Sequence, residues 1–156
     1  MILFTTSLSP NPKARGLARS LSSLFFGIYL NRGSKSFADI IGKAGAMGCS
    51  RACFITRDRG RPSSLKIASV SCSGWEWVPY ELKLGKSSSK KVKQAREIGS
   101  SAYSRSRKLN QIFGLEKSPF GSTTDISYSN NKLSFKQDKK EVFWIEADVI
   151  ERGDKG

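Results

Sequence analysis

The first 56 residues alternate short apolar runs with segments of helical periodicity, and this alternation constrains the fold more than any other feature. Residues 1–7, MILFTTS, and residues 51–56, RACFIT, are apolar and rich in strand-forming side chains. Between them, apolar residues recur at helical spacing over 12–25 and 37–47, and the strand-like IYLN separates the two segments. This order favours a sheet with parallel pairing. RACFIT lacks alternation, which is typical of a central strand covered on both faces.

Both predicted helices carry signals at their ends. Asn11 can cap the first helix, with Pro12 at the first helical position. Ser36 with Asp39 is a weaker form of the capping box at the start of the second helix. Gly48 can end that helix in the left-handed conformation.

After Pro62 the pattern changes to strands in series. SLKIASVSC and WEWVPYELKL are strand-like, and a basic loop with one helical turn is expected over 85–101. A third helix is predicted at 102–113. TDISYS, KLSFKQ and EVFWIEADVI then indicate an antiparallel meander, with turns at Asn130–Asn131 and at 138–140. The fold class is therefore mixed α/β.

Charge is the most unusual property of the composition. The 156 residues include 27 Lys and Arg against 13 Asp and Glu, a net charge of +14. Residues 1–115 hold 20 of the basic and 5 of the acidic side chains, so the last quarter is nearly neutral. Such an excess points to a polyanionic partner, most commonly nucleic acid, with an anionic membrane surface as the alternative.

Several classes of function lack the residues they need. Without histidine there is no Ser-His or Cys-His dyad, and the three cysteines show no metal-ligand spacing. We therefore expect no cofactor and no metal. Glu146 and Asp148 share a face of a predicted strand, most simply a solvated one. No apolar run reaches the roughly 20 residues of a membrane span, and the N-terminus lacks a basic leader region, so a cytoplasmic location is expected.

The basic side chains coincide with predicted loops and helix starts, and we take these as candidate RNA contacts. The loops after parallel strands emerge at one edge of a sheet, where ligands of open α/β sheets bind. SPNPKAR and TRDRGRP are therefore expected to be neighbours, and arginine guanidinium groups suit phosphate oxygens. The candidates are Lys13, Arg15, Arg19, Arg32, Lys35, Arg57, Arg59, Arg61, Lys90, Lys91, Lys93, Arg105, Arg107 and Lys108.

Two features keep alternative roles at this point. The Gly60-Arg61-Pro62 stretch can act in RNA binding or only in forming a turn. Trp75, Trp77, Phe143 and Trp144 lie in predicted strands, and we expect them in the core rather than as base-stacking platforms.

Taken together, several of these stretches resemble the Brix-domain family in its short archaeal form. The resemblance is carried by MILFTTS, SPNPKARGLARSL, YLNRGSKSFADII and TRDRGRPSSLKI, with the marker residues Gly60, Arg61, Pro62 and Leu65, and by NQIFGL at 110–115. RGRP stands where archaeal relatives have a His-Gly-Asn-Pro type of loop. Relatives also continue past ERGDKG into one more strand, so the second half is expected to be incomplete or closed differently.

The resemblance implies one Brix domain over residues 1–156, with two similar halves at about 1–74 and 75–156 that share mixed sheets. Each half is expected to resemble the anticodon-binding domain of class IIa aminoacyl-tRNA synthetases. The family further implies non-catalytic binding of ribosomal RNA or its precursor in ribosome biogenesis and rRNA processing. Other ribosome-assembly proteins are implied as partners, without a membrane or a small-molecule substrate.

Two functions of other classes remain as alternatives. The first is a protein-interaction module in a ribonucleoprotein complex, whose basic face meets an acidic protein. The second, which ranks well behind the other two functions, is an RNA-processing enzyme that uses unrecognised carboxylates such as Glu146 or Asp148.

Overall fold

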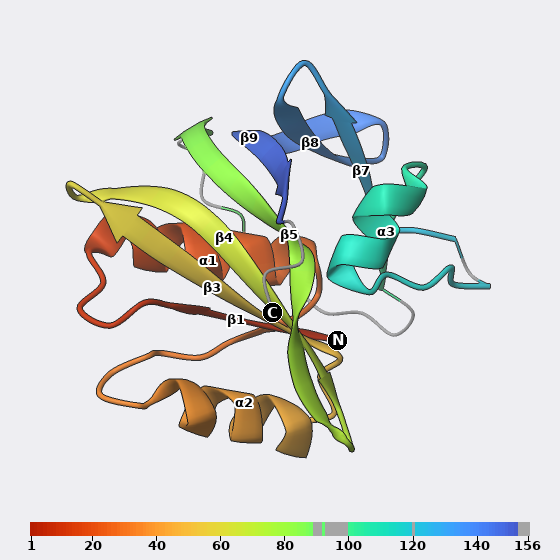
Figure 1. Cartoon of the computed structure of the whole chain (residues 1–156). Coiled ribbons are helices and arrows are strands. Elements are labelled where there is room, and N and C mark those ends of the chain that lie inside the picture. Colours follow the sequence, from red (N-terminus) through yellow and green to blue (C-terminus); the bar gives the residue numbers. More distant parts are fainter. Residues whose placement is uncertain (89–91, 93–99, 120, 153–156) are drawn as a thin grey trace.

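The computed structural model describes residues 1–88, 92, 100–119 and 121–152. Its described strands form one mixed sheet in the order β2-β1-β3-β4-β5-β9-β8-β7-β6, with helices on both faces (Figure 1). The strands are β1 (Ile2–Thr6), β2 (Ile28–Tyr29), β3 (Arg51–Asp58), β4 (Arg61–Ser71), β5 (Gly74–Ser87), β6 (Ala102–Ser104), β7 (Thr124–Ser129), β8 (Lys132–Gln137) and β9 (Lys140–Glu151). The helices are α1 (Pro12–Leu24), α2 (Phe37–Ala46) and α3 (Arg107–Phe113).

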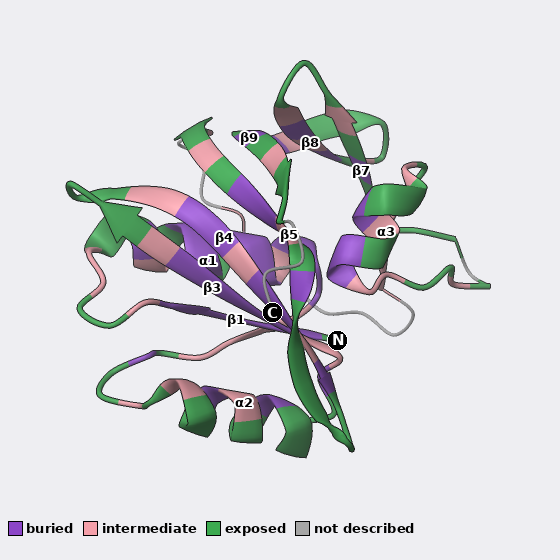
Figure 2. Cartoon of the chain, viewed as in Figure 1, coloured by how far each residue is buried: buried purple, intermediate pink, exposed green. Residues whose placement is uncertain are grey.

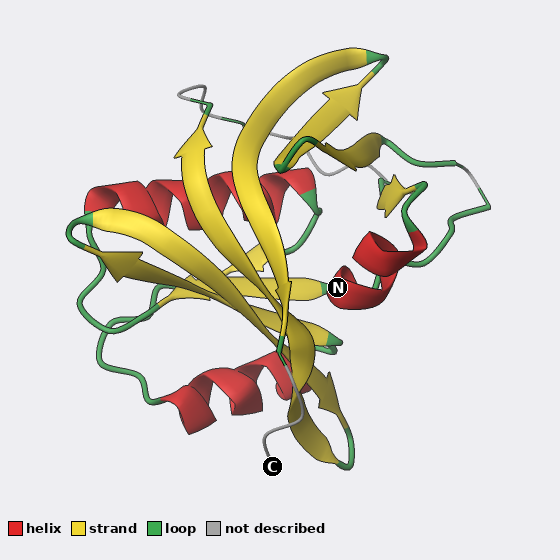
Figure 3. Cartoon of the chain, turned by 45° about the horizontal axis from the view of Figure 1, so that its top comes forward, coloured by secondary structure: helices red, strands yellow, loops and turns green. Residues whose placement is uncertain are grey.

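The N-terminal half has the parallel pairing that the sequence predicts. Leu3 of β1 lies opposite Ile28 of β2 on one side and Ala52 of β3 on the other. α1 lies on one face of these strands and α2 on the opposite face (Figures 1 and 3). Because both faces are covered, residues 52–55 of β3 are all buried.

Local hydrogen bonds explain where α1 and α2 begin. The Asn11 side chain accepts a hydrogen bond from the backbone N–H of Ala14 at 2.8 Å. Ser36 and Asp39 form a reciprocal capping box, with two hydrogen bonds of 3.1 Å. Gly48 follows α2 with φ +75°, which confirms the predicted left-handed end.

Gly27 after α1 is required for a close approach of two backbones. A Cβ atom at this position would lie 2.3 Å from the carbonyl oxygen of Ile2. No side chain fits there, so the chain can pass from α1 into β2 only with glycine at this point.

The predicted loop after β3 is a tight hairpin. β3 continues to Asp58 and β4 begins at Arg61, and the two residues between them, Arg59 and Gly60, have φ of 50° and 76°. Positive φ at both central positions matches the right-handed twist of paired strands. Two of the three arginines therefore belong to strand ends and only Arg59 to the turn.

The C-terminal half repeats the connectivity of the N-terminal half. β6 and β7 are parallel and joined through α3, and β8 and β9 follow in antiparallel order, as β1, α1, β3, β4 and β5 do. The predicted meander is confirmed, with its turns at residues 130–131 and 138–139. The helix predicted at 102–113 starts too early, because residues 102–104 pair with β7 and Ser106 caps α3.

The described residues of this half contain no counterpart of β2 or α2. The face that α2 covers in the other half carries polar side chains here, including Asp125, Ser127 and Lys136, which are exposed. A sheet face of this composition is stable in water without a covering helix. The fold class is therefore confirmed as mixed α/β with two similar halves, whereas the synthetase likeness and the boundary at residue 74 stay predictions.

The two halves share one sheet and one core. β5 pairs with β9 across the junction, with Leu82 opposite Val149. On the α1 face, the buried ring of Phe25 lies 5.5 Å from that of Phe4, 4.7 Å from that of Phe113 and 5.6 Å from that of Phe135. These centroid distances are typical of aromatic packing, so Phe25 joins side chains from both halves.

Candidate nucleic-acid interface

The loop after β1 and the β3–β4 hairpin are neighbours, as the parallel pairing predicts. The Asn11 side-chain amide donates a hydrogen bond to the carbonyl oxygen of Gly60. Ser7 N–H donates to the Ile55 carbonyl oxygen at 2.9 Å and so extends the contact along β3. Because Asn11 also caps α1, one side chain fixes the basic start of α1 against the hairpin.

A groove of about 1020 Å³ opens beside this contact. It lies between α1, the β3–β4 hairpin, the end of β5 and β9. Four cations and two carboxylates take part in its lining. The lining residues are Lys13, Gly16, Leu17, Ser20, Asp58, Arg61, Pro62, Ser63, Lys83, Leu84, Gly85, Lys86, Ser87, Ser88, Phe143 and Glu146.

Glu146 reaches the groove because β5 bulges opposite it. The β5–β9 register shifts between Leu84 and Ser87, and the Glu146 carboxylate accepts a hydrogen bond from Lys86 N–H at 3.2 Å. A Cβ atom on Gly85 would lie 2.6 Å from Glu146 Oε2, so glycine makes the room for this carboxylate. Glu146 therefore stabilises the end of β5. The four cations of the lining still outnumber its two carboxylates, so the groove is basic.

Of the three arginines of the hairpin, Arg61 lines this groove, whereas Arg57 and Arg59 are not among its lining residues. Arg57, Arg59 and Arg61 are all exposed. Asp58, which lies between Arg57 and Arg59, forms no ion pair within 4 Å in the described part of the chain. Exposed guanidinium groups held on a rigid hairpin are well placed for phosphate oxygens.

The basic residues of α1 divide between the groove and the side of the helix. Lys13 lines the groove. Arg15 is half-buried, and the Arg19 guanidinium lies 5.1 Å from the centre of the Tyr29 ring on β2. Arg19 therefore faces the outer edge of the sheet rather than the groove.

Arg32 is a structural residue, which corrects its prediction as an RNA contact. Its side chain is 7% exposed, and it donates to the Lys35 carbonyl oxygen at 2.7 Å and to that of Thr6 at 3.0 Å. Burial also lowers the pKa of Arg32 from its ordinary value. The Lys35 ammonium donates to the Asn31 carbonyl oxygen at 3.2 Å and lies apart from the groove lining. Arg32 thus holds the β2–α2 connection against the end of β1.

The third predicted cluster lies on a different surface. Arg105, Arg107 and Lys108 are exposed around the start of α3. Arg105 lines a separate cavity of about 520 Å³ with Tyr103 and other residues of β6–β8. Lys108 Nζ lies 4.8 Å from the centre of the Tyr80 ring. Lys90, Lys91 and Lys93 lie outside the described residues.

Lys83 and Lys86 also line the groove; Lys83 is absent from the predicted contacts, whereas Lys86 belongs to the basic loop predicted over 85–101. The alternation of apolar and polar residues around Leu82 and Leu84 continues through these lysines, and this pattern could have placed them on the strand. The bulge that brings Lys86 beside Glu146 depends on pairing with β9, which no local pattern shows.

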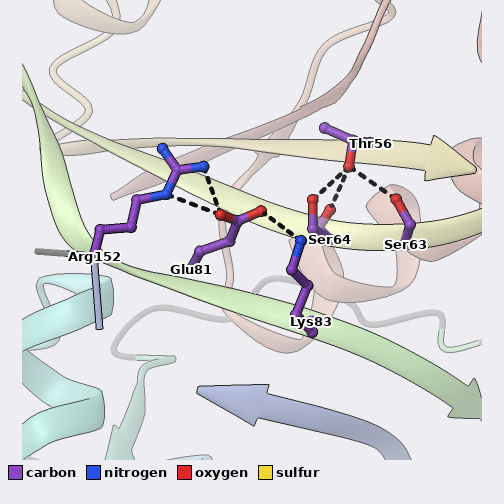
Figure 4. Close-up of polar contacts among 6 residues, drawn as sticks. All are labelled: Thr56, Ser63, Ser64, Glu81, Lys83 and Arg152. Carbon is purple, nitrogen blue, oxygen red and sulfur yellow. Dashed lines mark hydrogen bonds and ion pairs between the residues drawn. The ribbon is translucent and has the colours of Figure 1, made fainter. Parts of the chain in front are cut away.

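A buried carboxylate, Glu81, contacts both Arg152 and the groove residue Lys83 (Figure 4). Arg152 donates to Glu81 Oε2 through Nε at 2.8 Å, and Lys83 Nζ lies 3.5 Å from Oε1. Burial raises the pKa of Glu81, but hydrogen bonds from Arg152 and Ser64 and the charges of Arg152 and Lys83 outweigh it, so the pKa is lowered overall. The pair ties the last described residue of the chain to the middle of the sheet.

The described part of the chain offers little for other chemistries. It contains no helix long and apolar enough to cross a membrane. In that part of the chain, no three His, Cys, Asp or Glu side chains lie together in a group that could hold a metal ion. Cys53 is fully buried in β3, where burial raises the pKa of its thiol and it packs as an apolar side chain.

The sheet order and its helices match the fold of two solved archaeal proteins. The structure superposes on that of a probable ribosomal biogenesis protein from Aeropyrum pernix with a TM-score of 0.75 and 16% identity, covering 99% of this chain and 97% of the other. It superposes on Mil, an archaeal Imp4-like protein, with a TM-score of 0.68 and 18% identity, covering 96% of this chain and 99% of the other.

A curated relative carries the family name. The chain is 30% identical over 100 residues to a probable Brix domain-containing ribosomal biogenesis protein from Thermococcus kodakarensis. The match covers 64% of this chain and 45% of the relative, so it spans less than half of that protein's length. No family model matches the chain. The predicted resemblance is therefore supported by a relative that carries the Brix-domain name and by the shared fold.

Proposed function

We propose that the protein binds ribosomal RNA or its precursor as a non-catalytic factor in ribosome biogenesis and rRNA processing in the cytoplasm, together with other assembly proteins. One observation carries the proposal: the Asn11–Gly60 contact holds the start of α1 against the β3–β4 hairpin. That contact brings Lys13 and Arg61 to the same groove as Lys83 and Lys86.

The groove supports binding by charge and fixed spacing. Each phosphate that a Lys or Arg side chain neutralises releases counterions, which makes the affinity fall as salt rises. Serine hydroxyls in the lining, such as those of Ser20 and Ser63, add neutral donors for phosphate or ribose oxygens. Because the cations sit on paired strands and a capped helix, little conformational freedom is lost on binding.

The carboxylates of the groove support a non-catalytic role. Glu146 accepts a backbone hydrogen bond from Lys86 and is packed against Gly85. Asp148 lies on the exposed face of β9 and is not part of the groove lining. Glu146 is thus engaged in a contact within the fold, which supports a non-catalytic role.

The test compares two triple variants by fluorescence anisotropy with labelled fragments of ribosomal RNA. The first is Arg57→Gln, Arg59→Asn and Arg61→Gln, where asparagine keeps the positive φ of the turn. The control is Lys136→Gln, Lys139→Asn and Lys140→Gln, which removes three charges outside the groove, again with asparagine at the turn position.

We expect the hairpin variant to weaken binding at least tenfold more than the control. Equal losses would overturn the assignment of the groove. A wild-type protein that binds no ribosomal RNA, and that keeps its protein partners after ribonuclease treatment, would instead favour a protein-interaction module.

A further inference from the structure

Two tryptophans at the start of β5 are exposed, contrary to the expectation that they lie in the core. Trp75 is 44% and Trp77 is 40% exposed. Both stand on the β4–β5 hairpin, whose surface is exposed (Figure 2). Large aromatic side chains exposed side by side are unusual on a monomer and commonly mark a binding surface.

The tryptophan rings are held in place by a chain of aromatic contacts. The Phe37 ring lies 4.8 Å from that of Trp75 and 5.2 Å from that of Trp77, and it packs on the buried Phe54 at 5.0 Å. The two indole rings are 5.5 Å apart and nearly perpendicular, at 84°. We call Phe37, Trp75 and Trp77 the aromatic platform. Its rings are fixed before a partner arrives, which lowers the entropy cost of stacking.

Cations lie on the same face of the sheet as the platform. Trp77 pairs with Ala68, and two residues along β4 the side chain of Lys66 points to the same face, opposite Glu81. Glu81 is paired with two cations, Arg152 and Lys83, so this group keeps one net positive charge. Flat rings beside lysine and arginine match a partner that carries both aromatic bases and phosphates.

We propose that the aromatic platform stacks the bases of single-stranded RNA while Lys66 and Arg152 contact its phosphates. Stacking on aromatic side chains is a general way to bind unpaired bases without reading their sequence. The groove lining contains neither the platform residues nor Lys66 and Arg152, so the two sites take different parts of an RNA. The inference rests on the proposed RNA binding and adds a preference for unpaired segments.

The test uses a 12-nucleotide oligouridylate, which has no structure, and a 12-base-pair RNA duplex as probes. The double variant Trp75→Leu and Trp77→Leu removes the flat rings but keeps apolar side chains. The matched control is Trp144→Leu, which removes a tryptophan from β9, and Trp75→Phe with Trp77→Phe keeps aromatic rings. Circular dichroism confirms that each variant is folded.

We expect the double leucine variant to bind the oligouridylate about 10- to 100-fold more weakly, with duplex binding unchanged. The phenylalanine variant should lose less, and Trp144→Leu should bind as the wild type. In a Trp144→Phe background, the oligouridylate should quench the fluorescence of the two remaining tryptophans.

Two outcomes would overturn the inference in distinguishable ways. If the leucine variant binds the oligouridylate as tightly as the wild type, the platform is not a stacking site, and a contact with a protein becomes the better explanation of its exposed rings. This result would not affect the proposal that the groove binds RNA. If the wild type binds neither probe nor ribosomal RNA, the proposed function fails with it.

Discussion

Replacing Asn11 separates two roles of one side chain. The side-chain oxygen of Asn11, Oδ1, accepts a hydrogen bond from Ala14 N–H at 2.8 Å, and its side-chain nitrogen, Nδ2, donates to the Gly60 carbonyl oxygen. Loss of an N-cap costs about 0.5–2 kcal/mol, and loss of a neutral hydrogen bond about 0.5–1.5 kcal/mol. We expect Asn11→Ala to lower the free energy of unfolding by about 1–3 kcal/mol, and Asn11→Ser, which keeps a capping oxygen, by about 1 kcal/mol or less.

RNA binding then reports the contact with the hairpin. A serine hydroxyl is too short to reach Gly60, so both variants release the hairpin from the start of α1. Both should bind ribosomal RNA about 2- to 10-fold more weakly, the equivalent of one hydrogen bond. Urea unfolding gives the stabilities, and anisotropy at fixed salt gives the affinities. If Asn11→Ser binds as tightly as the wild type, convergence of the two loops does not organise the site, and this reasoning is refuted.

Two further predictions concern the fold. Gly27→Ala should destabilise the protein by more than about 2 kcal/mol, because the new Cβ would lie 2.3 Å from the Ile2 carbonyl oxygen. Gly42→Ala in α2, where a Cβ would meet nothing within 4 Å, should stabilise the protein by up to about 1 kcal/mol. Similar urea midpoints for the two variants would contradict this prediction. Glu81 has a folded-state pKa below its ordinary value of 4.5, so its contribution to stability is complete above that pH and is lost as the pH falls through the lower folded value. The stability gap between wild type and Glu81→Gln, measured by urea unfolding, should therefore be largest at neutral pH and shrink below pH 4.5; a gap independent of pH would count against the ion pair with Arg152.

Much of the N-terminal half was predictable because its signals are local. The periodicity of α1 and α2 and their caps at Asn11 and Ser36 are written in neighbouring residues, and the structure has both. Parallel pairing followed from the order of elements, and it correctly brought the loop after β1 to the hairpin after β3.

Errors arose where distant residues decide the outcome. β6 has three residues and exists only through its pairing with β7, so its sequence was taken as the start of a helix. Arg32 follows a strand, as a phosphate-binding residue would, but its guanidinium group donates hydrogen bonds to the carbonyl oxygens of Thr6 and Lys35. The exposure of Trp75 and Trp77 depends on how the β4–β5 hairpin packs against α2, which composition does not show.

The central claim is that the groove beside the β3–β4 hairpin binds RNA through phosphate contacts. The most direct test is the dependence of ribosomal RNA affinity on salt, measured for the wild type, the hairpin variant at residues 57, 59 and 61, and the control at 136, 139 and 140. Each lost phosphate contact should reduce the log–log slope by about 0.7–0.9, so the hairpin variant should lose about 2–3 in slope. The control should keep the wild-type slope. Equal slopes for all three proteins would contradict the claim.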